Sequence, residues 1–343
     1  MSIVLGFQVG AWRWPGLIML GIVLAIVGAG AGLAQESTPA SVTAYALPDG
    51  IGDIGGTIEI DGSSTVFPIM DEARAQFEEI ADEIEIQAEF SGTGGGFRRF
   101  CADEIDIAAA SRPISPDEIA ACSEGGVRYY AFTLAYDGVT VVVHPSNDFV
   151  SCLTVDQLHL LWRPDDPATT WQDLDPAWPD EEIALYGPGQ DSGTFDFFTA
   201  TILGESGLSR LDYFPSEDDN VLVAAVIDDE EALGYFGYAY YQDEDVRDDL
   251  KAVAIDVGGG CVLPDATTIA DGSYQPLSRP LYLYARSESM ARLGVLEFLR
   301  FTVASARDIV PLVGYVPLPD AEYVAQQAKL EGAAVGNVAP DGP

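Results

Sequence analysis

The sequence has very few basic residues. Its 343 residues include 16 Lys and Arg against 55 Asp and Glu, which gives a formal net charge of -39. A chain with this balance repels nucleic acid and anionic membrane surfaces, so neither is expected as a partner. The field also opposes an anionic ligand, but salt screens it over about 8–10 Å. We therefore interpret the acid excess as a solubility device.

Cysteine and histidine are scarce as well. The chain has two histidines, and its four cysteines are Cys101, Cys122, Cys152 and Cys261. This spacing fits no zinc pattern, so no metal site is expected. An even number of cysteines in an exported chain indicates disulfides. Of the three possible pairings we expect Cys101–Cys122 and Cys152–Cys261, because the first two flank one strand–turn–helix unit.

The only feature of the N-terminus that resembles a targeting segment is an apolar run over 17–33, preceded by Arg13. It predicts a signal peptide over 1–34 with cleavage after Ala34. The alternative is an uncleaved membrane anchor. No cysteine follows the run, which excludes a lipid-modified N-terminus. Residues 35–54 are rich in small and polar residues and are predicted to be a flexible linker. The protein is then periplasmic or extracellular, or membrane-anchored if the segment is not cleaved.

The remaining residues alternate between strand and helix patterns, and the length suggests about two domains. The predicted strands are 57–61, 84–90, 105–110, 129–134, 139–144, 183–186, 234–241, 251–256 and 280–285. The predicted helices are 69–80, one opening at 97–100, 115–122, 154–162, one opening at 191, 219–227, 290–304 and 320–330. This alternation predicts an α/β protein with largely parallel sheets.

One pattern occurs three times: a strand, a Ser/Thr/Gly loop, then a helix. It covers residues 60–65, 90–95 and 186–194. In open α/β sheets, ligands bind where strand ends meet helix starts, and helix starts attract anions. Ser or Thr before a helix is often only an N-cap. Three such turns together predict a site where hydroxyl and backbone N–H groups converge on one tetrahedral oxyanion.

Four segments then resemble a known family. They are residues 62–68 (Gly-Ser-Ser-Thr-Val-Phe-Pro), 91–97 (Ser-Gly-Thr-Gly-Gly-Gly-Phe), 109–113 (Ala-Ala-Ser-Arg-Pro) and 191–194 (Asp-Ser-Gly-Thr). Their order and spacing are similar to those of the periplasmic phosphate-binding proteins of phosphate ABC transporters, the PstS-like family. The resemblance implies a two-lobed type II periplasmic binding protein fold. Dehydrated phosphate would lie in the cleft between the lobes.

The resemblance also implies a domain plan. Lobe 1 would hold 55–136 and 277–320, lobe 2 would hold 137–276, and 321–343 would form a C-terminal helix and tail. The chain would cross between lobes near 136–139 and 275–281. The implied partners are inorganic phosphate and the ABC permease subunits, with a monomeric protein and no cofactor.

The resemblance implies a set of phosphate-binding residues. They are Ser64, Thr65 and Val66 in the first loop, Thr93 and Gly94 in the second, and Ser192, Gly193 and Thr194 in the opposite lobe. We add Ser111 and Arg112, which follow the third strand.

The sequence departs from the family pattern at two positions. Ser111 stands where many members have an Asp that accepts the phosphate proton, and Pro188 stands where many have an Arg. We expect Arg112 to supply the missing charge, although it could instead form a surface ion pair. Asp61 or Asp191 could accept the proton, or could only cap or orient its loop.

Three alternative functions remain. The chain could bind another oxyanion, such as sulfate, molybdate or arsenate, or it could sense phosphate without transporting it. A serine hydrolase is disfavoured, because residue 190 is Gln where a nucleophile elbow has Gly. A catalytic triad at Ser192 would need His144 or His159. We therefore expect no enzymatic activity.

Overall fold

The computed structural model describes residues 42–46, 48, 55–190, 192–242 and 246–342. The predicted signal peptide over 1–34, its possible role as a membrane anchor, and Asp191 lie outside the described residues. Among the helices of the described ranges, none is long and apolar enough to cross a membrane.

The strands confirm most of the predicted pattern. They are β1 (Gly56–Gly62), β2 (Ile84–Ala88), β3 (Ile107–Ala110), β4 (Tyr129–Val143), β5 (Cys152–Thr154), β6 (Ala184–Pro188), β7 (Phe214–Ser216), β8 (Ala232–Gly237), β9 (Lys251–Ala252), β10 (Ala254–Asp256), β11 (Cys261–Val262), β12 (Ser278–Arg286) and β13 (Val316–Pro317).

The helices alternate with these strands. They are α1 (Phe67–Glu78), α2 (Thr93–Cys101), α3 (Pro116–Glu124), α4 (Val155–Trp162), α5 (Trp171–Leu174), α6 (Gly193–Ile202), α7 (Asp219–Asp228), α8 (Tyr238–Tyr241), α9 (Ala266–Ala270), α10 (Leu293–Leu312) and α11 (Asp320–Ala334), with 3-10 turns η2 (Arg247–Asp249) and η3 (Ser289–Ala291).

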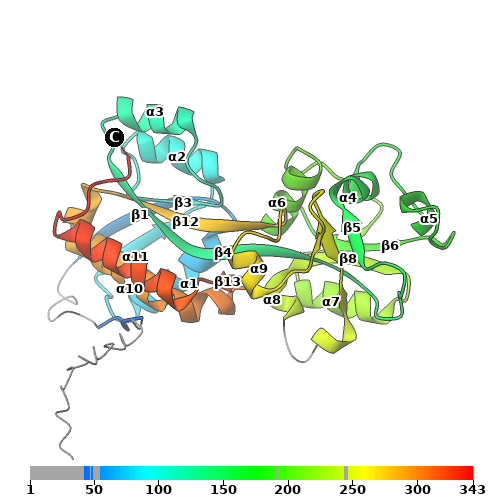
Figure 1. Ribbon diagram of the computed structural model, residues 1–343. Coiled ribbons are helices and arrows are strands. Elements are labelled where there is room, and N and C mark those ends of the chain that lie inside the picture. Colours follow the sequence, from blue (N-terminus) through cyan, green and yellow to red (C-terminus); the bar gives the residue numbers. More distant parts are fainter. Residues whose placement is uncertain (1–41, 47, 49–54, 191, 243–245, 343) are drawn as a thin grey trace, which may run out of the picture. The chain divides into compact units, whose positions relative to one another are not determined.

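The longest strand, β4, links the two halves of the main sheet (Figure 1). The strand order is β2-β1-β3-β12-β4-β8-β6-β7. Residues 129–138 of β4 pair antiparallel with β12, and residues 139–143 pair antiparallel with β8. Two separate strands were predicted here, which is wrong, because β12 remains paired to β4 as far as Gly138. The partner changes at the predicted crossing, although the lobe boundaries themselves stay predictions.

Each half of the sheet has helices on both faces. Around β1, β3 and β12, helices α1, α10 and α11 cover one face and α2 and α3 cover the other (Figure 1). Around β6 and β8, α4 and α6 pack on one face, and α7 packs on the other against Val142 and Phe236. The predicted C-terminal helix is therefore part of the first core, to which α11 contributes Tyr323 and Leu330.

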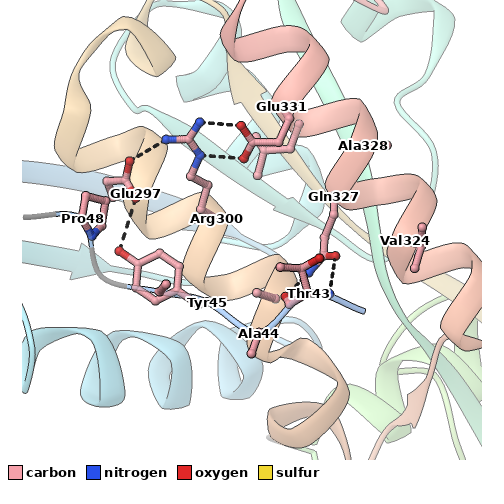
Figure 2. A pocket seen from close by; sticks show the side chains of 13 residues that line it. Thr43, Ala44, Tyr45, Pro48, Glu297, Arg300, Val324, Gln327, Ala328 and Glu331 are labelled. Carbon is pink, nitrogen blue, oxygen red and sulfur yellow. Dashed lines mark hydrogen bonds and ion pairs between the residues drawn. The ribbon is translucent and has the colours of Figure 1, made fainter. Parts of the chain in front are cut away.

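Part of the predicted linker is packed against this core. The ring of Tyr45 makes an edge contact with Phe301 at 5.5 Å, and its hydroxyl donates to Glu297 Oε2 at 3.3 Å. Thr43 exchanges two backbone hydrogen bonds with the Gln327 amide. These contacts border a pocket of about 540 Å³ between the segment, α10 and α11 (Figure 2). The flexible linker predicted over 35–54 is thus wrong at 42–46, because an aromatic side chain there completes an apolar core.

Two element boundaries differ from the prediction near the loops. Helix α2 begins at Thr93 instead of 97, because Gly96 lets the helix lie directly on β1. A Cβ at Gly96 would be 2.5 Å from Gly62 Cα. Strand β8 ends at Gly237 and α8 follows, where a strand to 241 was predicted. The pairing of β8 with β4 ends at Val139, beyond which β4 pairs with β12.

Both predicted disulfides are confirmed. Cys101–Cys122 joins the end of α2 to α3, and Cys152–Cys261 joins β5 to β11. Cys122 is fully buried, so the first bond lies inside the packing of the two helices.

Candidate functional site

Loop 1, residues 63–66, connects β1 to α1. Gly62 has φ 145° and a Cβ there would lie 2.0 Å from Ala109 O, so only glycine lets β1 and β3 end side by side. Ser63 N–H donates to Ala109 O at 2.9 Å. Val66 N–H donates to Ser63 O at 3.1 Å. The predicted ligand Val66 therefore uses its N–H group within the turn.

Asp61, near the end of β1, holds loop 2 (residues 89–92) by hydrogen bonds. This carboxylate is fully buried and accepts hydrogen bonds from Gly62 N–H, Ser91 N–H, Ser91 Oγ and Arg99 Nη1 at 2.7–2.8 Å. Burial alone would raise the pKa of Asp61, but Arg99 and Ser91 hold it below its ordinary value. Four donors occupy both oxygens, so Asp61 orients loop 2, which is the second of the two roles considered for it.

The first turn of α2 lies beside the end of β3. Thr93 Oγ1 accepts a hydrogen bond from Ser111 N–H at 3.3 Å and lies 3.3 Å from Ser111 Oγ. The structure thus brings these two predicted ligands together. Gly94 lies next to them in the same helical turn.

Arg112 has a carboxylate partner. Its guanidinium donates two 2.8 Å hydrogen bonds to the two oxygens of Glu118 on α3, and its side chain is 44% exposed. A Cβ on Gly94 would lie 3.8 Å from Arg112 Nη2, so the arginine borders the first turn of α2. The carboxylate of Glu118 raises the pKa of Arg112. The positive charge of Arg112 is therefore partly neutralised by Glu118.

Helix α6 brings the third set of predicted ligands from lobe 2. Ser192 is its N-cap and accepts from Thr194 N–H at 3.2 Å. Gly193 lies directly against loop 1. A Cβ there would be 2.7 Å from Thr65 Oγ1 and 3.2 Å from Thr65 N. The first residue of α6 and the centre of loop 1 are therefore in contact, and the predicted domain plan assigns them to different lobes.

Sequence reasoning missed Arg279 and Asp137. Arg279, on β12, donates from Nη2 to Thr65 Oγ1 at 2.9 Å and pairs with Asp137 Oδ2 on β4 at 3.0 Å. Its guanidinium lies 3.9 Å from the ring centroid of Phe197 on α6. Asp137 is 1% exposed; its burial raises its pKa, although Arg279 acts in the opposite direction.

A signal for Arg279 was present in the sequence. The residue lies within the predicted return crossing near 275–281, directly before the apolar and aromatic strand predicted over 280–285. A cation that such a segment buries needs a charged or polar partner. Arg279 lies outside the three Ser/Thr/Gly loops.

The two histidines do not support a triad with Ser192. His144 follows β4 and bonds to Ser146 Oγ at 2.7 Å. Since β4 runs antiparallel to β8 and β6 runs parallel to β8, His144 lies at the edge where β6 begins, whereas Ser192 follows the end of β6. His159 is exposed on α4. The site offers hydroxyl groups, amides at helix starts and a guanidinium, which can hold an oxyanion without covalent chemistry.

Comparisons with known proteins define the class first. A family model described as a PBP superfamily domain matches residues 40–306. A solved structure of a possible phosphate binding protein from Planctomyces limnophilus is 42% identical, with a TM-score of 0.78, and the match covers 82% of this chain and 99% of that one. The chain therefore has the type II periplasmic binding protein fold, with two lobes around a ligand cleft, as the sequence predicted.

The curated relatives define the family more closely. The chain is 44% identical to Protein SphX of a Synechocystis species, over 82% of this chain and 84% of that protein. It is 37% identical to the phosphate-binding protein PstS of Staphylococcus saprophyticus, over 80% and 85%. The chain belongs to the PstS-like family of phosphate-binding proteins. Its relatives are solute-binding proteins, and it is not an enzyme.

Proposed function

We propose that this protein captures inorganic phosphate reversibly in the cleft and delivers it to the permease of a phosphate ABC transporter. The observation that carries the proposal is the meeting of Thr65, Gly193 and Arg279, which come from loop 1, from α6 and from a crossing strand. The proposed site thus combines three helix starts and one guanidinium. Such a set of donors suits a dehydrated oxyanion.

The proposed ligands combine the predicted loops with the residue found in the structure. They are Ser64, Thr65, Thr93, Gly94, Ser111, Arg112, Ser192, Gly193, Thr194 and Arg279. Arg279 is the main source of positive charge, because it contacts Thr65 and its side chain is only 17% exposed, whereas the side chain of Arg112 is 44% exposed.

Selectivity depends on the acceptor for the phosphate proton. Asp61 is occupied by four donors, and Asp191 lies outside the described residues. We assign the acceptor role to the hydroxyls of Thr93 and Ser111, which can accept as well as donate. A hydroxyl can turn to donate to sulfate, whereas a carboxylate would repel it. The family membership favours phosphate over sulfate, and these hydroxyls should discriminate between the two anions less than a carboxylate would.

The proposal also covers the export, location and partners of the protein. The chain is exported by the segment over 1–34 and acts in the periplasm or outside the cell, or on the membrane surface if that segment stays attached. The two disulfides support an oxidising compartment. The permease subunits are the partners, and the binding protein itself is a monomer.

The test is calorimetric titration of phosphate and of sulfate into the dialysed protein over 35–343. Saturable one-site binding of phosphate, tighter than that of sulfate, supports the proposal. Binding of sulfate without any binding of phosphate would overturn it.

A further inference from the structure

The start of α7 lies beside the loop that leads into α6. Strands β6 and β7 are parallel and pair at Pro188 and Ser216, so both end at the same edge of the sheet. Gly189 N–H, in the loop before α6, donates to Ser216 O at 3.1 Å. Asp219 is the first residue of α7, three positions after Ser216. The start of α7 therefore holds a carboxyl group close to the proposed phosphate site.

The carboxyl group of Asp219 is half-buried and weakly compensated. Gly237 N–H donates to its Oδ2 at 3.3 Å, which is long for a hydrogen bond. Asp61, by contrast, accepts four hydrogen bonds at 2.7–2.8 Å. Burial raises the pKa of Asp219 to about 6. Asp219 is thus ionised at neutral pH, and a further negative charge nearby favours its protonation.

The groups that face Asp219 come from several elements and are either acidic or neutral. The acidic ones lie on β4 and directly before α7, and each raises the pKa of Asp219: Asp137, Glu217 and Asp218. The neutral ones are phenols on β8, on α8 and directly before β13, whose pKa values are raised by burial: Tyr235, Tyr240 and Tyr315. Asp219 therefore adds negative charge that the pair of Asp137 and Arg279 leaves uncompensated.

Asp219 is connected to Arg279 through neighbouring strands. Gly237, its hydrogen-bond donor, is the last residue of β8 and pairs with β4 two positions after Asp137. Asp137 lies directly opposite Arg279 on β12. Arg279 in turn donates to Thr65 Oγ1 at 2.9 Å. The connected groups therefore end at a proposed phosphate ligand.

An anion beside Arg279 changes the affinity of Asp219 for a proton. Phosphate brings at least one negative charge into the cleft, and closure of the cleft removes water that would screen it. Coupling between two binding events is reciprocal, so a proton on Asp219 strengthens phosphate binding by the same factor by which phosphate strengthens proton binding.

We infer that phosphate binding is coupled to uptake of a proton from solvent, and that the carboxylate of Asp219 accepts this proton and returns it when phosphate leaves. The inference rests on the proposed function and adds a condition to it. The protein binds phosphate more tightly as its surroundings become acidic, because the carboxylate that opposes the anion becomes a neutral carboxylic acid.

The experiment compares Asp219→Asn with the wild type in the chain over 35–343. Asn keeps an acceptor for Gly237 N–H but cannot titrate. Asp228→Asn is the matched control, because it removes one exposed charge about 14 Å further along the same helix. Phosphate and sulfate are titrated calorimetrically at about pH 5, 6.5 and 8. Proton uptake at the middle pH is obtained from two buffers that differ in their enthalpy of ionisation.

At about pH 8, Asp219→Asn should bind phosphate about fivefold more tightly than the wild type, because it lacks the opposing charge. At about pH 5 the two should bind alike, because Asp219 is then protonated. At about pH 6.5 the wild type should take up about 0.3 proton more than the variant. This difference excludes protons that phosphate itself takes up, because both proteins bind the same anion. Asp228→Asn should match the wild type throughout.

Equal affinity of Asp219→Asn and the wild type at every pH would overturn the inference. Weaker binding by Asp219→Asn at about pH 8 would overturn it too, because the carboxylate would then support the anion instead of opposing it. A gain of the same size in Asp228→Asn would assign the effect to net charge alone and would also overturn it. If the wild type binds sulfate but no phosphate, the proposed function fails, and the sulfate titrations decide the inference. If it binds neither anion, both fail.

Discussion

Arg279 Nη2 donates a 2.9 Å hydrogen bond to the hydroxyl of Thr65. Arg279 lies on β12 at the predicted return crossing between the lobes, and Thr65 occupies the loop that contacts α6 through Gly193. The same guanidinium is held by the buried carboxylate of Asp137. One cation, Arg279, thus links the crossing strands to the proposed anion site.

Replacing Arg279 by Gln should weaken phosphate binding at least 10-fold. The change removes a hydrogen bond from a charged donor, which contributes about 1.5–3 kcal/mol. Calorimetric titration measures the loss. Because Asp137 is left without its partner, the melting temperature must be recorded as well, and Asp137→Asn in the same chain restores a neutral pair for comparison.

The matched control is Arg286→Gln at the other end of β12. Arg286 pairs with Asp103 and donates to Ile105 O at 3.4 Å, away from loop 1. The Arg286→Gln variant should bind phosphate as tightly as the wild type. An equal loss of affinity in both variants would show that Arg279 acts only through the general charge of the protein.

The ion pair of Arg112 predicts opposite effects of two substitutions. Arg112→Gln should weaken phosphate binding, but less than Arg279→Gln, because Arg112 is more exposed to water than Arg279. Glu118→Gln should strengthen binding by up to about fivefold, because an exposed pair is worth about 0.2–1 kcal/mol. Gln keeps the capping box with Ser115, so α3 stays intact. No change in either variant would mean that Arg112 takes no part in the site.

Gly193→Ala should separate α6 from loop 1. Its Cβ would lie 2.7 Å from Thr65 Oγ1 and 3.1 Å from Thr65 Cα, so the lobes could not meet as they do in this structure. Overpacking of this kind costs about 1–3 kcal/mol, and we expect at least a 10-fold loss of phosphate affinity without a lower melting temperature. Gly259→Ala is the control, because a Cβ there meets nothing within 4 Å. Wild-type affinity for Gly193→Ala would refute the proposed contact.

Stability should depend on the charge of Asp219. Burial raises the pKa of this carboxyl from 3.8 to about 6. A hydrogen bond from Gly237 N–H lowers the pKa, and nearby acidic residues raise it further. The folded state therefore binds the proton more tightly, so this group stabilises the fold below about pH 4 and its contribution disappears as the pH rises through about 6. Two pKa units correspond to about 2–3 kcal/mol.

Asp219→Asn cannot titrate and isolates this effect. Urea unfolding between about pH 4 and 7 should show a smaller gain in the free energy of unfolding on acidification for the variant than for the wild type. Identical pH profiles would mean that Asp219 has the same pKa in the folded and unfolded states.

Local patterns were sufficient for much of the fold. Alternation predicted β1 and β2, and the capping boxes at Ser115 and Thr154 marked the starts of α3 and α4. Cysteine spacing predicted both disulfides. The long strand β4 was divided into two, because the pairing that keeps 136–138 extended comes from β12, more than 130 residues later. The local sequence around 136–138 cannot show that these residues pair with such a distant strand.

Prediction of the site from local sequence was limited for the same reason. The neighbourhood of the first two Ser/Thr/Gly loops was predictable, since they follow β1 and β2, which are parallel and end at one edge of the sheet. The third loop follows β6, which runs opposite to β1, and it meets loop 1 through the contact of Gly193 with Thr65. The partners of the charged side chains were not predictable in the same way. Asp61 is satisfied by Ser91 and Arg99, and Arg279 by Asp137 and Thr65, through contacts that join distant segments. Only the folded arrangement shows which cation the cleft contains.

The most direct test of the central claim is a crystal structure of the protein grown with one equivalent of phosphate. The account predicts a single anion between the lobes, within about 3 Å of the Thr65 hydroxyl, the Gly193 N–H and the Arg279 guanidinium, as charge-assisted hydrogen bonds require. An anion bound elsewhere, with Arg279 paired only to Asp137, would contradict it.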